Sequence, residues 1–255
     1  MSEDNQEQLA EGTLISHLLE LRERLVKAAI AVAIAFAPCA YFSNTLLTLV
    51  AEPLMRQLPS DSKLITTSVV GSFMVPIKMA VLVALVIAAP VVLYQAWAFV
   101  SPGLYKKEKR FAVPLLISSI ALFYSGVLFA YFLVMPLAFK FLIATTPGGI
   151  GYTPDIGNFV DFATLFFLGF GGAFEIPVAT VLLLWTGMVR IETLTQNRGY
   201  VLIGIAVLTA IITPPDAVSM ILMMLPMYVL YEIGILAARV MFKDKLAAQN
   251  KSPAT

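Results

Sequence analysis

Long apolar runs are the feature that most constrains how this chain can fold. Several of them exceed the roughly 18 apolar residues that a helix needs to cross a hydrocarbon layer about 30 Å thick. Only 13% of the 255 residues are charged, whereas an ordinary soluble domain has roughly 25% charged residues. The runs therefore predict an all-α integral membrane protein that crosses the bilayer several times.

Segments rich in polar residues, Gly and Pro divide the apolar runs into six predicted spans. We expect these spans at residues 25–49, 74–100, 111–144, 159–189, 200–212 and 218–240. The fifth has only 13 residues, which is about 20 Å of helix and shorter than the hydrocarbon core. The segment between the first two spans is too polar to cross a bilayer and predicts a structured loop at one membrane surface.

The placement of Lys and Arg predicts the orientation of the spans. Six spans put both termini on one side, and all but four of the 17 Lys and Arg residues fall on that side. The four others are Arg56, Lys63, Lys78 and Lys140. The positive-inside rule therefore predicts an N-in, C-in topology. Residues 1–13 then form a disordered cytoplasmic tail, residues 14–243 the six-span domain, and residues 244–255 a second cytoplasmic tail.

Residue counts argue against several kinds of chemistry. The chain has one cysteine, Cys39, and one histidine, His17, which argues against an intrachain disulfide and against a His/Cys metal site. It has no phosphate-binding glycine loop with a lysine, which argues against ATP hydrolysis. His17 precedes the first span and is expected at the surface, which argues against serine–histidine catalysis inside the membrane. We therefore expect no catalytic residue, no metal and no cofactor.

A charged segment, SHLLELRERL at residues 16–25, stands directly before the first span. Its leucines recur at helical spacing and form an apolar stripe that can lie on a membrane or against neighbouring spans. Glu20 and Arg24 are four residues apart, in the favourable order for a local ion pair. One interpretation is an amphipathic flank that serves topology alone. The other is that Glu20, with Glu108 after the second span, accepts a cationic peptide at the membrane surface.

Glu175, in the fourth span, is the strongest local signal. An ionised carboxylate deep in a span costs about 2.5 kcal/mol or more, so such residues usually face a water-filled cavity, find a partner or stay protonated. Pro177 follows two residues later and favours a kink there. Glu175 therefore either faces a polar functional cavity or bonds to a neighbouring span. A proton-coupled solute transporter that titrates Glu175 is an alternative function.

Four motifs together resemble the TatC family, the polytopic subunit of the bacterial twin-arginine protein translocase. In chain order they are SHLLELRERL, FVSPGLYKKEKR, FGGAFEIPVA and TPPD. Each motif is weak alone, but four in register over residues 14–243 are specific. The resemblance implies six transmembrane helices in a concave, glove-shaped bundle in the bacterial inner membrane, and a receptor rather than an enzyme.

The resemblance also implies what this protein would bind. Its ligand would be the twin-arginine signal peptide of folded precursor proteins, and transport would draw on the proton-motive force. Its partners would be TatA- and TatB-like single-span subunits, membrane lipids and further copies in an oligomer, with no nucleic acid.

By motif, the resemblance implies a signal-peptide site made of Glu20, Glu108, Arg22 and Phe99. The two glutamates would contact the arginine pair, and the other two residues would shape the same cytoplasmic patch. A guanidinium pairs with a carboxylate in bidentate bonds whose geometry lysine cannot copy, so such a site can distinguish arginine from lysine. The resemblance further assigns Pro53 to a periplasmic cap, Glu175 to the concave membrane face and Asp216 to the turn between the last two helices. A purely structural scaffold would instead tolerate neutralisation of its glutamates.

Overall fold

The computed structural model describes the backbone of residues 3–59, 63–100, 109–147, 152–186, 188–213 and 217–241, and the side chains in these ranges other than those of 3–14, 100, 109–112, 212 and 218–219. Over these residues the chain is all-α, as the sequence predicted. The described residues form no named strand, and an isolated parallel bridge joins Ile65 to Asp155.

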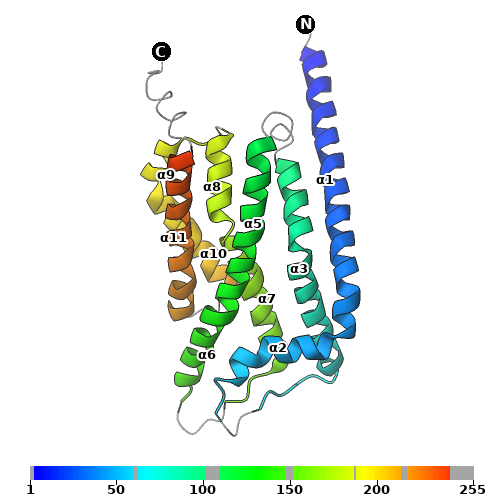
Figure 1. The fold of residues 1–255 in the computed structure, drawn as a ribbon, viewed down its shortest axis with the longest axis vertical. Helices are drawn as coiled ribbons and strands as arrows, with labels where there is room; N and C mark the ends of the chain where they lie inside the picture. The colour runs from blue at the N-terminus through cyan, green and yellow to red at the C-terminus, as the bar shows by residue number, and fades with distance from the viewer. Residues whose placement is uncertain are drawn as a thin grey trace. The chain divides into compact units, whose positions relative to one another are not determined.

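Figure 1 shows the helices coloured along the chain from blue to red. In chain order they are α1 (Glu3–Tyr41), α2 (Ser43–Met55), α3 (Gly71–Val100), α5 (Lys109–Phe129), the π-helical turn η1 (Ala130–Val134), α6 (Met135–Ala144), α7 (Ile156–Ala173), α8 (Ile176–Trp185), α9 (Ile191–Gln196), α10 (Arg198–Ile212) and α11 (Ala217–Met241).

Five segments within the described ranges are long and apolar enough to cross a membrane. They are Ile15–Tyr41, Gly71–Phe99, Val113–Ala144, Ile156–Trp185 and Met220–Met241. They correspond to the first four predicted spans and the sixth. The predicted fifth span corresponds to α10, whose 15 residues make about 22 Å of helix. The described part of the chain thus has five candidate spans and a shorter apolar helix, where the sequence predicted six spans.

The helix that contains the first span, α1, begins and ends earlier in the chain than the predicted span of residues 25–49. We expected the span to reach residue 49, but α1 ends at Tyr41 and α2 begins at Ser43. Ser and Asn side chains bond to nearby backbone groups and so favour turns and helix starts, and Ser43 and Asn44 stand at this break. At its other end α1 begins at Glu3, within the segment 1–13 predicted as a disordered tail. Gln, Glu, Leu and Ala fill residues 6–11 and are strong helix formers.

The chain divides into two compact units, and the first comprises Met1–Leu49 and Ser72–Ile120. Within it α1 and α3 run side by side (Figure 1). Their contact is built on the small buried side chains of Cys39, Ala80 and Ala84, which allow two helices to approach closely.

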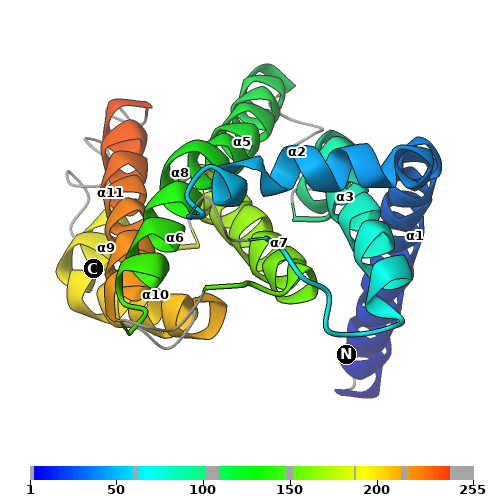
Figure 2. The same cartoon turned by 90° about the horizontal axis from the view of Figure 1, so that it is seen from below.

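The second unit comprises Val50–Gly71 and Ala121–Thr255. Within it α11 packs against α8 and α10 (Figure 1 and Figure 2). α11 and α8 approach closely at Gly234, where a Cβ would lie 2.8 Å from Cα of Pro177. The backbones of α11 and α8 therefore touch at a position where no larger residue fits without movement.

The predicted kink in the fourth span is confirmed as a break between two helices. α7 ends at Ala173 and α8 begins at Ile176, with Pro177 in its first turn. Proline lacks the N–H that would continue the α7 hydrogen-bond ladder, and its ring clashes with the preceding turn. The N–H of Glu175 instead donates to the carbonyl oxygen of Gly172 at 3.1 Å. The break therefore fixes Glu175 at a bend between two helices.

Candidate functional site

A stack of two rings joins α1 to the end of α3. The ring centroids of His17 and Phe99 are 4.4 Å apart, and the ring planes meet at 19°. His17 is exposed, as the sequence predicted, and Phe99 is half-buried. The stack brings Phe99 against the charged segment that precedes the first span. Sequence reasoning did not give His17 this role, because its partner is 82 residues away.

Glu20 lies one helical turn after His17 on the same face of α1, because residues three apart are neighbours on a helix. Its Oε1 accepts hydrogen bonds from Nε of Arg24 at 3.0 Å and from Nη2 of Arg24 at 2.5 Å. The local ion pair predicted from the sequence is therefore confirmed. Both of these bonds use Oε1 and neither uses Oε2. We name His17, Glu20, Arg24 and Phe99 the collar patch.

The ion pair within the collar patch is a weak one. The side chains of Glu20 and Arg24 are 33% and 23% exposed, and a pair at this helical spacing contributes about 0.3–0.5 kcal/mol. A hydrogen bond to a charged group in a better-shielded complex contributes roughly 1.5–3 kcal/mol. The pair with Arg24 therefore holds the Glu20 carboxylate only weakly.

Arg22, also predicted for this site, does not join the collar patch. Arg22 is exposed and lies two positions from Glu20, a spacing at which helical side chains do not face each other. Glu108, the second predicted acceptor, lies outside the described residues, as does Asp216 in the predicted turn.

Glu175 is half-buried at the bend between α7 and α8, with Oε1 shielded from solvent. Beside it, the ring of Phe174 packs against that of Phe129 at a centroid distance of 5.5 Å. Among the cavities that the described residues of the second unit form are ones of about 200, 440 and 410 Å³, and Glu175 does not line these.

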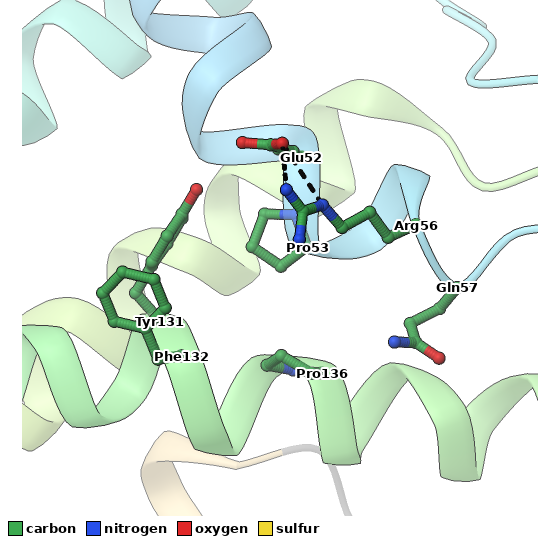
Figure 3. A pocket seen from close by; sticks show the side chains of 7 residues that line it. All are labelled: Glu52, Pro53, Arg56, Gln57, Tyr131, Phe132 and Pro136. Atoms are coloured by element: carbon green, nitrogen blue, oxygen red, sulfur yellow. Dashed lines mark hydrogen bonds and ion pairs between the residues drawn. The ribbon is translucent and has the colours of Figure 1, made fainter.

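Pro53, predicted in a periplasmic cap, is buried within α2. It lines the cavity of about 200 Å³ together with Glu52, Arg56 and Tyr131 (Figure 3). Proline inside a helix removes one backbone hydrogen bond, so α2 is held by packing as well as by its own ladder.

Asp155 connects the loop before α3 to the start of α7. Its Oδ1 accepts from the backbone N–H groups of Gly157 and Asn158 at 2.8 and 3.0 Å. Its Oδ2 accepts from the N–H and the hydroxyl of Thr67 at 2.9 and 2.8 Å. The bond from Asn158, followed by those from Thr67, lowers the pKa of the carboxyl from 3.8 to about 2. Sequence reasoning missed this residue, although Asp before an apolar run is a typical helix cap.

A second polar cluster ties α10 to α11. Arg198 Nε lies 2.7 Å from Glu232 Oε1, and the hydroxyl of Tyr228 donates to the same oxygen at 3.2 Å. The hydroxyl of Tyr231 donates to the carbonyl oxygen of Leu194 at 2.9 Å. These bonds are structural links between helices of the second unit.

Comparison with known proteins gives consistent matches over most of the chain. The family model described as "Sec-independent protein translocase protein (TatC)" matches residues 16–226. The TatC protein of Escherichia coli strain K12 is 49% identical over 226 residues, which cover 89% of this chain and 88% of that protein. The TatC protein of Azotobacter chroococcum mcd 1 is 44% identical and covers 93% of each chain. A solved structure, "Crystal Structure of Twin Arginine Translocase Receptor- TatC", superimposes with a TM-score of 0.76 at 38% identity and covers 88% of this chain and 98% of that one.

Proposed function

Because the chain belongs to the TatC family of Sec-independent protein translocase proteins, we propose that it is the signal-peptide receptor and core subunit of a twin-arginine translocase. The protein is a multi-pass membrane component of protein transport and not an enzyme. In our proposal it lies in a bacterial inner membrane and exports folded precursors, using the proton-motive force. The name of the similar solved structure, which calls that protein a receptor, supports this role.

The stack of His17 on Phe99 is the observation that carries the proposal. It supports a single binding patch, because it joins residues from two of the motifs that resemble the family. Glu20 lies on the same face of α1 as His17, and the two rings offer a flat surface on which a guanidinium can stack. A peptide arginine can therefore bind the Glu20 carboxylate and pack against the rings at the same time.

We assign the second peptide arginine to Glu108. Arginine pairs bind two carboxylates better than one, and lysine cannot reproduce the bidentate geometry. Arg22, whose side chain does not face Glu20, would shape the edge of the patch from the neighbouring face of α1. Pro53 would belong to the periplasmic cap, Glu175 to a concave membrane face and Asp216 to the turn before α11.

The proposed topology is N-in and C-in, with α10 as a short fifth span in a six-span, glove-shaped bundle. Its support is the placement of Lys and Arg on the terminal side. A cysteine at Val69, which is 96% exposed, should be labelled from outside intact cells, and one at Met188, which is 74% exposed, only after the inner membrane is permeabilised. Labelling of Met188 from outside, with Val69 labelled only after permeabilisation, would show the opposite orientation.

We further propose that TatA- and TatB-like single-span subunits and other copies of this chain assemble around it. The large exposed apolar side chains of α1, among them Ile30 and Ile34, support contact with lipid or with single helices. Residues 1–13 and 244–255 would serve as cytoplasmic tails outside the membrane domain.

Site-specific crosslinking tests the receptor role. A photoreactive residue at Ser16, four positions before Glu20, should crosslink a twin-arginine signal peptide more strongly than a twin-lysine peptide. The same probe at Val69, in the loop proposed on the other side of the membrane, should crosslink neither peptide. Equal crosslinking of both peptides at Ser16 would contradict the proposed recognition of the arginine pair.

A further inference from the structure

The cavity beside Pro53 has a charged wall and an aromatic wall. Figure 3 shows Glu52 of α2 and Arg56, the residue after the end of α2, on one side and Tyr131 and Phe132 of η1 on the other. Its volume of about 200 Å³ is below the range of roughly 300–1,000 Å³ for drug-sized ligands. The cavity is therefore suited to a small polar group.

The charged wall carries both signs of charge. Nε and Nη2 of Arg56 donate to Oε1 of Glu52 at 3.2 and 2.6 Å, and neither bond uses the second carboxylate oxygen. The side chains of Arg56 and Glu52 are 74% and 50% exposed. An exposed pair at this spacing is weak, so a ligand with both charges can bind the two groups at little cost.

The aromatic wall is an irregular turn of helix. Tyr131 and Phe132 belong to η1, where the hydrogen-bond pattern changes from α to π between α5 and α6. Single π-turns inside α-helices occur frequently at functional sites. This turn faces the ion pair across the cavity (Figure 3).

The position of Tyr131 along its span indicates which ligand is available. The candidate span begins at Val113, and Tyr131 comes 18 residues later, at about 27 Å along the helix. Pro136, also in the cavity wall, comes at about 35 Å. A hydrocarbon core about 30 Å thick that begins near Val113 therefore ends at this cavity. Phe132, Leu133 and Leu137 are exposed along the same stretch, as expected for side chains that meet acyl chains.

We propose that this cavity binds the headgroup of a zwitterionic phospholipid that carries a primary amine. The phosphate pairs with Arg56, the ammonium group pairs with Glu52, and the rim of Tyr131 and Phe132 lies between the headgroup and the acyl chains. The two charges of the ligand match the two charges of the wall. An anionic headgroup without an amine would satisfy Arg56 but leave the Glu52 carboxylate facing like charge.

Native mass spectrometry of the full chain in detergent tests this site. The protein is titrated with short-chain phosphatidylethanolamine, with phosphatidylglycerol of the same chain length, and with free phosphoethanolamine. We expect the ethanolamine lipid to bind about tenfold more tightly than the glycerol lipid. Glu52→Gln and Arg56→Gln should each reduce its affinity about ten- to hundredfold. Arg198→Gln, which breaks an exposed ion pair elsewhere in the same unit, should leave it unchanged.

Each other outcome counts against the proposal. Equal binding of the two lipids by the parent protein would show a non-selective lipid surface. Binding of free phosphoethanolamine as tight as that of the lipid would identify a soluble phosphate ester as the ligand. If a cavity variant does not fold, the relative affinity of the parent protein for the two lipids still tests the proposal.

Discussion

The ring of His17 lies nearly parallel to the ring of Phe99, with 4.4 Å between their centroids. This contact joins the segment before the first span to the end of α3, 82 residues further along the chain. Because Glu20 is the next residue on that face of α1, the contact puts a carboxylate one turn from an aromatic pair. Both features suit the recognition of a guanidinium.

Removing the stack should weaken peptide binding without disturbing assembly. An aromatic pair contributes about 0.5–1.5 kcal/mol beyond the area it buries, so His17→Leu should lower signal-peptide affinity roughly two- to tenfold. His17→Phe keeps a ring and should stay close to the parent. Fluorescence anisotropy of a labelled twin-arginine peptide measures the affinity of both variants. Equal loss in the two variants would mean that the ring stack is not the cause.

The Asp155 cap should make stability depend on pH at the acid end. The folded pKa of about 2 lies below the ordinary value of 3.8, so the carboxylate stabilises the fold at pH values above about 4. This contribution is lost as the pH falls from 3.8 through 2. Asp155→Asn should therefore lower the melting temperature in detergent at pH 7, and the difference from the parent should shrink toward pH 2.

Glu192→Gln provides the control for Asp155, since it neutralises an exposed carboxylate on α9. It should leave the melting temperature nearly unchanged at every pH. If the melting temperatures of Asp155→Asn and the parent differ by the same amount from pH 7 to pH 2, protonation of Asp155 does not cause the pH dependence.

Two glycine substitutions separate packing from helix propensity. A Cβ at Gly234 would meet Cα of Pro177 at 2.8 Å and Cβ of Thr180 at 3.0 Å, so Gly234→Ala should cost about 1–3 kcal/mol through overpacking. A Cβ at Gly204 meets nothing within 4 Å, so Gly204→Ala should be neutral or stabilise α10 by up to about 1 kcal/mol. Thermal unfolding in detergent compares them, and a neutral Gly234→Ala would contradict the close contact of α11 with α8.

Neutralising Glu175 should affect transport more than folding. Glu175 lies at the helix break and its Oε1 is shielded from solvent. Burying a carboxylate is costly, so we expect a carboxyl group kept there to serve transport. We expect Glu175→Gln to keep the protein level of the parent and to lose most export of a folded reporter. If Glu175→Gln exports normally while Glu175→Leu only lowers the protein level, Glu175 is structural.

Local patterns predicted much of this structure. The Glu20–Arg24 pair and the break at Pro177 depend on residues within one or two turns of a helix, and both are confirmed. The α1–α2 boundary was missed because apolar residues continue through α2, and hydropathy alone does not separate a span from a surface helix.

Contacts between distant segments could not be read from the sequence. Thr67 and Asp155 are 88 residues apart, and each residue type is common in loops. The sequence contained the signal for a helix cap at Asp155. It did not indicate that Thr67 would donate to the second carboxylate oxygen, because only the fold brings the two residues together. The partner of His17 was missed for the same reason, since no spacing rule connects α1 to the end of α3.

The most direct test of the central claim compares Glu20→Gln with Glu23→Gln. Both glutamates lie on the same stretch of α1 and both have a cation four residues later, at 2.5 Å for Glu20 and 2.6 Å for Glu23. Affinities of twin-arginine and twin-lysine signal peptides are measured for the parent and for each variant at two salt concentrations. If Glu20 binds the arginine pair, Glu20→Gln lowers twin-arginine affinity about ten- to hundredfold and removes the preference over lysine, while Glu23→Gln stays within about twofold of the parent. Twin-arginine affinity within about twofold of the parent in both variants would contradict the claim and leave this segment a topological flank.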